Sequence, residues 1–175
     1  APAYRIVAAT RNGVTGGFAP PAEVAGLASG AGDVSPWLAA GGAQIYFGSA
    51  RAGGLGGDDL YVADLTAAGA GDAADLTAVN SAADDASPVL SRDGLTLYFA
   101  SKRADPAARG NDDIWIARRP AASAAFGPPA AVAELNSAAA DGPRWLSPDG
   151  CTLYFTSDRS GGQGGYDLYT ATRGR

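Results

Sequence analysis

Short apolar runs separated by turn residues are the main pattern along this chain of 175 residues. The runs are four to seven residues long and are bounded by Gly, Pro, Asp or Asn. Residues 152–157, for example, follow the turn Pro148-Asp149-Gly150 and combine β-branched with aromatic side chains, as strands do. With 25 glycines and 11 prolines, the chain has few positions suited to a long helix. The pattern therefore predicts an all-β fold.

The same segment occurs three times. Residues 40–61, 91–115 and 147–169 each contain a turn, a strand with Leu/Ile-Tyr-Phe, and a further strand that opens with Asp. The opening residues Asp59, Asp113 and Asp167 follow one another at intervals of 54 residues. A repeat of this length, made of short strands, is typical of the four-stranded antiparallel blades of a β-propeller. We therefore expect a propeller with three repeat units per chain.

The chain is expected to form a single propeller domain over residues 1–175. Residues 18–24 match residues 126–132 at a distance of two periods, so the N-terminal part corresponds to the last two strands of a blade. The predicted units are a half blade at 4–28, blades at 33–80 and 85–136, and an incomplete blade at 141–173.

Such a partial propeller would leave an apolar sheet face open at each end. Several hundred Å² of wet apolar surface costs roughly 10 kcal/mol, at about 25 cal/mol per Å². We therefore expect two chains to close as a six-bladed ring, with residues 22–27 of one chain completing the last blade of its partner. The alternative is that the chain is a fragment of a longer propeller.

Two kinds of charged residue recur in every copy. An arginine ends one strand and an aspartate opens the next, and the two could form a bidentate pair that fixes the hairpin. We expect structural ion pairs between the arginines Arg51, Arg103 and Arg159 and the aspartates Asp59, Asp113 and Asp167.

The candidate binding residues lie just before each inner strand, where the connections of a propeller gather at one mouth of its channel. The expected channel-mouth carboxylates are Asp33, Asp84, Asp85 and Asp141, with Trp37 and Trp145 behind them. Converging carboxylates could hold Ca²⁺ or attract a basic partner segment. The alternatives are solvated turn acids and tryptophans that pack between blades. The sequence specifies no metal site, and no cofactor other than this possible Ca²⁺ is expected.

Several classes of function are disfavoured. A net charge of −5 argues against nucleic-acid binding, which needs clustered Lys and Arg. No apolar stretch has the length of a membrane span, so no membrane insertion is expected. The chain contains no His, which removes Ser-His-Asp and Cys-His arrangements, and we expect no enzymatic activity.

The repeated Asp-Gly-x-x-Leu-Tyr-Phe-x-Ser-x-Arg, followed by Asp-Leu/Ile-Tyr/Trp, resembles the TolB-type WD-like β-propeller repeat family. The resemblance implies a periplasmic or secreted protein of the cell envelope. It also implies a non-enzymatic module that binds a protein or envelope component at the channel mouth. A glycan or small-ligand receptor, and a self-assembling half-propeller without a ligand, remain as alternatives.

Overall fold

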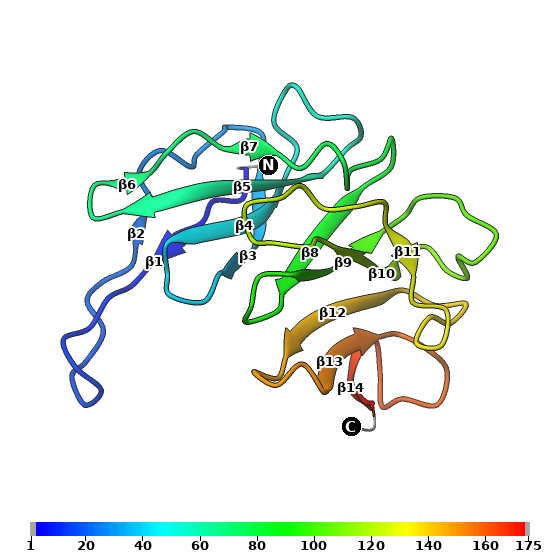
Figure 1. Cartoon of the computed structure of the whole chain (residues 1–175). Helices are drawn as coiled ribbons and strands as arrows, with labels where there is room; N and C mark the ends of the chain where they lie inside the picture. Colours follow the sequence, from blue (N-terminus) through cyan, green and yellow to red (C-terminus); the bar gives the residue numbers. More distant parts are fainter. Residues whose placement is uncertain (1–2, 174–175) are drawn as a thin grey trace.

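The chain folds into antiparallel β-sheets that succeed one another along the sequence and stand side by side (Figure 1). The computed structural model describes residues 3–173. In this range every regular element is a strand, so the all-β prediction is confirmed. Over the same residues, no helix exists that could cross a membrane.

The first sheet pairs β1 (Val7–Ala8) with β2 (Ala22–Glu23). The second contains β3 (Asp33–Leu38), β4 (Gln44–Ser49), β5 (Asp59–Thr66), β6 (Gly69–Ala70) and β7 (Ala74–Asp75). The third contains β8 (Asp85–Leu90), β9 (Thr96–Ser101), β10 (Asp113–Arg118) and β11 (Ala130–Ala131). The fourth contains β12 (Asp141–Leu146), β13 (Thr152–Ser157) and β14 (Asp167–Thr172).

The inner strands of the last three sheets are neighbours, with β8 between β3 and β12. From each inner strand the chain runs outward as an antiparallel meander, as in a propeller blade. The second sheet carries one strand that the sequence pattern does not predict. Strand β5 continues to Thr66, the chain turns at residues 67–68, and β6 begins at Gly69, whose φ of 126° suits glycine.

The outer strand of the third sheet is shorter than expected. The apolar run 130–135 predicts a full strand, but β11 ends at Ala131 and the chain turns at residues 132–135. Beyond this turn, the side chain of Asn136 replaces the hydrogen bonds that a longer β11 would make with the backbone of β10. Its Oδ1 accepts from the Ile114 N–H at 2.8 Å, and its Nδ2 donates to the Ile114 carbonyl at 3.1 Å. Asn80 makes the same two bonds with Leu60 in the second sheet.

Successive sheets pack face to face through apolar clusters. Between the second and third sheets, Tyr46 and Leu60 join a buried cluster with Phe99 and Trp115. The corresponding clusters are Ile6 and Leu27 with Phe47 and Tyr61 at the preceding junction, and Val89 and Ile114 with Leu153 and Phe155 at the following one. The repeat therefore provides one apolar face toward the preceding sheet and another toward the following sheet.

The last sheet leaves its second apolar face open. Trp145 and Leu168 are 44% and 64% exposed, whereas their equivalents one unit earlier, Val89 and Ile114, are 2% and 0% exposed. The difference arises because a following sheet covers Val89 and Ile114 and none of the described residues covers Trp145 and Leu168.

The first sheet is open in the opposite direction. Val7 and Phe18 are largely exposed, whereas their equivalents two periods later, Trp115 and Phe126, are buried in the core. The connection between β1 and β2 extends away from the sheets as an arm (Figure 1), and within it Arg11 stacks on Phe18. The two ends of the described chain therefore expose complementary sides of the repeat.

Candidate functional site

Each arginine that follows a second strand lies over two neighbouring aromatic rings. The Cζ of Arg103 lies 5.1 Å from the ring centre of Phe99 and 4.9 Å from that of Trp115. Its Nη2 donates to Asp85 Oδ1 at 2.6 Å and to the carbonyl of Val79 at 2.7 Å. Since Val79 belongs to the preceding unit, this guanidinium links two successive sheets as well as the strands of its own sheet.

The other two copies repeat this geometry. Arg51 donates to Asp33 at 2.8 Å and to the Leu27 carbonyl at 2.9 Å, and Arg159 donates to Asp141 at 2.6 Å and to the Leu135 carbonyl at 2.7 Å. Each arginine pairs with an aspartate of the inner strand, so the predicted pairing with Asp59, Asp113 and Asp167 is wrong.

The strand register explains this correction. Asp33 lies opposite Ser49 in the antiparallel ladder, and Nε of Arg51 donates to Ser49 Oγ at 3.0 Å. This bond turns the guanidinium back across the inner strand and toward Asp33. Arg51 therefore pairs with Asp33, which is close in space, and not with Asp59, which is closer in sequence.

Burial removes three of the predicted channel-mouth residues from the surface. Asp33, Asp85 and Asp141 are at most 3% exposed, so these carboxylates are not the open rim that the sequence suggests. Burial disfavours the charged form of Asp33, yet its hydrogen bonds with Arg51, Ser49 and Ser29 outweigh this effect and lower its pKa. Burial likewise opposes ionisation of Asp141, and its bonds to Ser157, Arg159 and Ser137 together lower its pKa.

The aspartates that open the third strands hold the preceding loops. Asp59 accepts from the Gly56 N–H at 3.0 Å, Asp113 from the Gly110 N–H at 3.1 Å, and Asp167 from the Gln163 N–H at 2.9 Å. Burial raises the pKa of Asp59 despite these bonds. The loops before the third strands are therefore coiled around a carboxylate, which favours a structural role for them.

The two predicted tryptophans lie in different surroundings. Trp37 is half-buried and packs against the clusters on both sides of the third sheet. Trp145 lies on the open face of the last sheet, edge-to-face with Tyr154 at 5.4 Å between ring centres. The structure does not bring these two side chains together with Asp84.

Asp84 lines a polar hollow that we call the mouth pocket, defined by Asp58, Asp84, Lys102, Asp112 and Arg144. The hollow has a volume of about 210 Å³ and lies beside the starts of the inner strands β8 and β12. Asp84 Oδ2 is 2.7 Å from Lys102 Nζ, and both side chains are partly exposed. Of the four predicted carboxylates, Asp84 is the one that the structure leaves accessible in this pocket.

The electrostatics of the mouth pocket are unbalanced. The hydrogen bond from Lys102 holds the pKa of Asp84 low, and the bond to Asp84 raises the pKa of Lys102. Desolvation raises the pKa of Asp58, and the charge of Asp84 raises it further. Desolvation also raises the pKa of Asp112, with Asp84 acting in the same direction. Three carboxylates therefore share one lysine, with Arg144 as a second cation nearby.

A row of polar side chains crosses the inner strands beside this pocket. Nη1 of Arg144 donates to Ser87 Oγ at 3.0 Å, and Ser87 Oγ lies 3.5 Å from Ser35 Oγ. Both serines have positive φ, 51° and 54°, at the bulge of their strand. Such backbone angles are uncommon for residues other than glycine. The row joins three sheets through polar contacts at their inner edges.

Several residues of the mouth pocket were missed by the sequence reasoning. Asp58 and Asp112 directly precede the repeated aspartates, and the sequence pattern assigns them no role of their own. Lys102 offered a usable signal, because it stands where the third copy has Asp158 in the Ser-x-Arg element. Within residues 3–173, no group of three His, Cys, Asp or Glu side chains could hold a metal ion, and Ca²⁺ binding stays a prediction.

Comparisons with known proteins bear on the fold. No family model matches the sequence, and no curated protein matches it. The structure is similar to the crystal structure of TolB from Acinetobacter baumannii, with 22% sequence identity and a TM-score of 0.58. The match covers 89% of this chain and 33% of that chain, so the chain spans about a third of the length of that TolB. The similarity supports a TolB-like β-propeller fold.

Proposed function

We propose that the chain is a non-enzymatic interaction module of the cell envelope that binds a segment of another protein at the mouth pocket. The TolB-like fold supports an interaction role and an envelope location. A non-catalytic role is also favoured by the chemistry of the buried acids. Asp33, Asp85 and Asp141 are engaged by arginines, and the aspartates of the third strands hold loops.

The charge of the mouth pocket carries this proposal. A hollow of about 210 Å³ has room for one side chain, and its lining holds more carboxylates than cations. The raised pKa values of Asp58 and Asp112 mean that their charged forms lack sufficient compensation. A lysine or arginine side chain of a partner would supply it. The proposed ligand is therefore a basic peptide segment.

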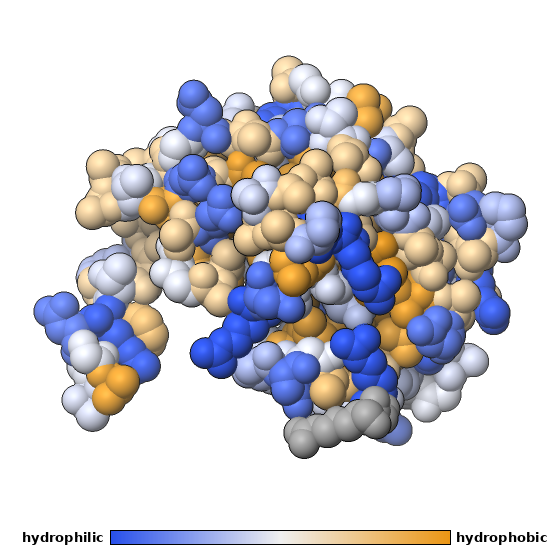
Figure 2. Space-filling model, in the orientation of Figure 1, coloured by the Kyte–Doolittle hydropathy of each residue, from blue (hydrophilic) through white to orange (hydrophobic). Residues whose placement is uncertain are grey.

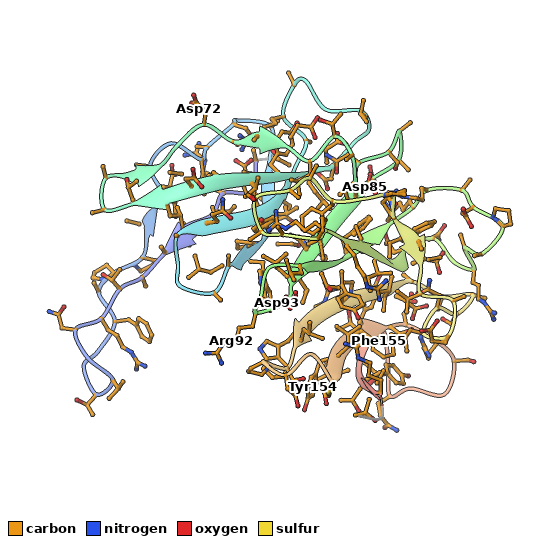
Figure 3. All side chains as sticks on the ribbon, viewed as in Figure 1. Asp72, Asp85, Arg92, Asp93, Tyr154 and Phe155 are labelled. Atoms are coloured by element: carbon orange, nitrogen blue, oxygen red, sulfur yellow. The ribbon has the colours of Figure 1, made fainter. Side chains whose placement is uncertain are left out.

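A labelled lysine-rich peptide tests the proposal by fluorescence anisotropy at low and moderate salt. We expect Asp112→Asn to weaken binding about tenfold, which corresponds to roughly 1.4 kcal/mol. Asp72→Asn removes the same charge from an exposed position on the second sheet (Figure 3) and should leave the affinity unchanged. Equal losses in both variants would show that only the net charge matters, and the proposal would fail.

Self-assembly into a closed ring is a second candidate, favoured by the open face of the last sheet. Trp145, Tyr154 and Leu168 surround an apolar hollow of about 290 Å³ on that face. The equivalent positions of the third sheet are covered by a following sheet. We propose that a second copy of the chain supplies this cover, which would close two chains as a six-bladed ring.

Light scattering tests ring closure. We expect a mass of about twice 17.4 kDa for the wild type and a monomer for Leu168→Asp, because a charge on the open face prevents its burial. Leu55→Asp is the matched control, since Leu55 is 53% exposed in the loop between β4 and β5. A wild-type monomer at high protein concentration would contradict the dimer.

A further inference from the structure

A groove with several arginines separates the third and fourth sheets at the end opposite the mouth pocket. Two adjoining hollows of about 460 and 410 Å³ share Tyr98, Arg118, Leu146 and Arg173. Arg92 lines the larger hollow from the turn between β8 and β9, where Figure 3 labels it. Figure 2 shows hydrophilic and apolar surface side by side over this region of the molecule. We call this region the arginine groove.

The junction between the second and third sheets shows how the equivalent region is filled one repeat earlier. There Arg119, the equivalent of Arg173, donates to the Gly94 carbonyl at 2.6 Å and to the Tyr46 hydroxyl at 3.3 Å. The ring of Phe126 lies 4.4 Å from its Cζ. The guanidinium at that junction is thus covered and bonded, whereas Arg173 is exposed.

The facing strand differs in charge between the two junctions. The second sheet presents Asp64 near the end of β5, and the Asp64 carboxylate accepts from Gln44 Nε2 at 2.8 Å. One period later the third sheet presents Arg118 at that position. The junction between the second and third sheets therefore carries one carboxylate and one guanidinium at these two positions. At the same two positions the arginine groove carries the guanidinium groups of Arg118 and Arg173.

The carboxylates near the arginine groove do not take the position of Asp64. Asp93 lies on a turn, where its carboxylate accepts from Ser91 Oγ at 2.6 Å and from the Leu95 N–H at 3.0 Å. Asp149 accepts in the same way from Ser147 Oγ and the Cys151 N–H on the next turn. Glu134 lines only the smaller hollow. The strand position of Arg118, between the third and fourth sheets, therefore lacks the negative charge that Asp64 carries between the second and third sheets.

We propose that the arginine groove binds a small organic oxyanion, whose anionic group lies between Arg118 and Arg173. Guanidinium groups present a planar fork of N–H donors that fits phosphate and carboxylate oxygens. Tyr98 and Leu146 provide apolar surface in both hollows for the body of the ligand. The ligand supplies at this strand position the negative charge that Asp64 carries between the second and third sheets.

Phenyl phosphate is a suitable probe, because it combines an oxyanion with one apolar ring. Isothermal titration at constant ionic strength should show saturable binding, weaker binding of inorganic phosphate, and no binding of phenol. Arg118→Gln should reduce the affinity about tenfold. Arg118→Asp should abolish binding, because it places a carboxylate where the second sheet has Asp64. Thermal unfolding of each variant checks the fold, and Arg173→Gln provides the same test should Arg118→Gln fail to fold.

Arg109→Gln is the matched control for charge. Arg109 is exposed in the loop between β9 and β10, so its loss changes the net charge equally without touching the arginine groove. We expect its affinity for phenyl phosphate to equal that of the wild type. The proposal is overturned by absence of saturable binding to the wild type. An Arg118→Gln affinity equal to the wild type, or an equal loss in Arg109→Gln, also overturns it.

Discussion

Arg103 and Asp85 form an ion pair of 2.6 Å across the third sheet, and both side chains are largely buried. The Asp85 carboxylate is fully buried and also accepts from the Ser81 N–H at 2.6 Å. Because Arg103 donates to the Val79 carbonyl as well, the pair ties the sheet to the preceding unit. Three such contacts recur in the chain, so the repeat carries its own connection between sheets.

Removing Arg103 should therefore destabilise the whole domain. Arg103→Ala leaves a buried carboxylate without its cation, which typically costs about 3–5 kcal/mol in the free energy of unfolding. Arg103→Lys should recover only part of this, because an ammonium group cannot match the stacking of the planar guanidinium over the two rings. Urea unfolding measures both variants. Arg109→Ala, at an exposed position, should stay within about 0.5 kcal/mol of the wild type.

Acid should weaken the equivalent connection between Asp33 and Arg51. The pKa of Asp33 is below its ordinary value of 3.8, so its stabilising effect is present above that pH and is lost as the pH falls through the folded-state pKa. Asp33→Asn should be less stable than the wild type near pH 7, and its stability should fall less steeply below about pH 4. Urea midpoints at a series of pH values measure the slopes. An unchanged slope in Asp33→Asn, or an equal change in Asp72→Asn, would contradict this linkage.

The amide of Asn136 is expected to be as important as a pair of strand hydrogen bonds. Asn136→Ala leaves the buried N–H and carbonyl of Ile114 without these bonds, which should cost about 2–3 kcal/mol. Chemical denaturation measures the loss. Asn111→Ala is the control, since Asn111 is exposed in a loop. A change of less than about 0.5 kcal/mol in Asn136→Ala would mean that water replaces the amide.

The sequence predicts the strands well because each carries a local signal. Alternating apolar residues and Asp-Gly turns mark residues 96–101 and 152–157 as strands, and the period aligns them as equivalent units. The end of β11 carries no such signal. There the side-chain amide of Asn136 replaces the backbone hydrogen bonds of a strand. A hydrophobic pattern does not distinguish side-chain from backbone hydrogen bonds.

The candidate site was harder to predict because it depends on register and on neighbouring sheets. Arg51 is nearer in sequence to Asp59 than to Asp33, yet the ladder places Asp33 opposite Ser49. Asp58 and Asp112 come together only because successive sheets stand side by side around β8. The spacing of residues along the chain does not show which sheets are neighbours. The sequence therefore predicts Asp84 as a binding residue and misses these two carboxylates.

The glycine loop before β14 offers a test of whether Asp167 orders its loop. A Cβ on Gly162 would collide with Oδ2 of Asp167, whereas a Cβ on Gly164 would meet open space. Gly162→Ala should therefore displace the carboxylate from the Gln163 N–H and cost about 1–3 kcal/mol by overpacking. Gly164→Ala should be neutral or stabilise by up to about 1 kcal/mol, because alanine restricts the unfolded chain.

Urea unfolding of the two alanine variants, combined with Asp167→Ala, separates the carboxylate's role from general loop rigidity. If Asp167 orders the loop, the cost of Gly162→Ala should shrink in the Asp167→Ala background, since the colliding atom is gone. The cost of Gly164→Ala should be the same in both backgrounds. Full additivity of Gly162→Ala and Asp167→Ala would show that the loop is held by other contacts, and the structural role assigned to this repeated aspartate would then be wrong.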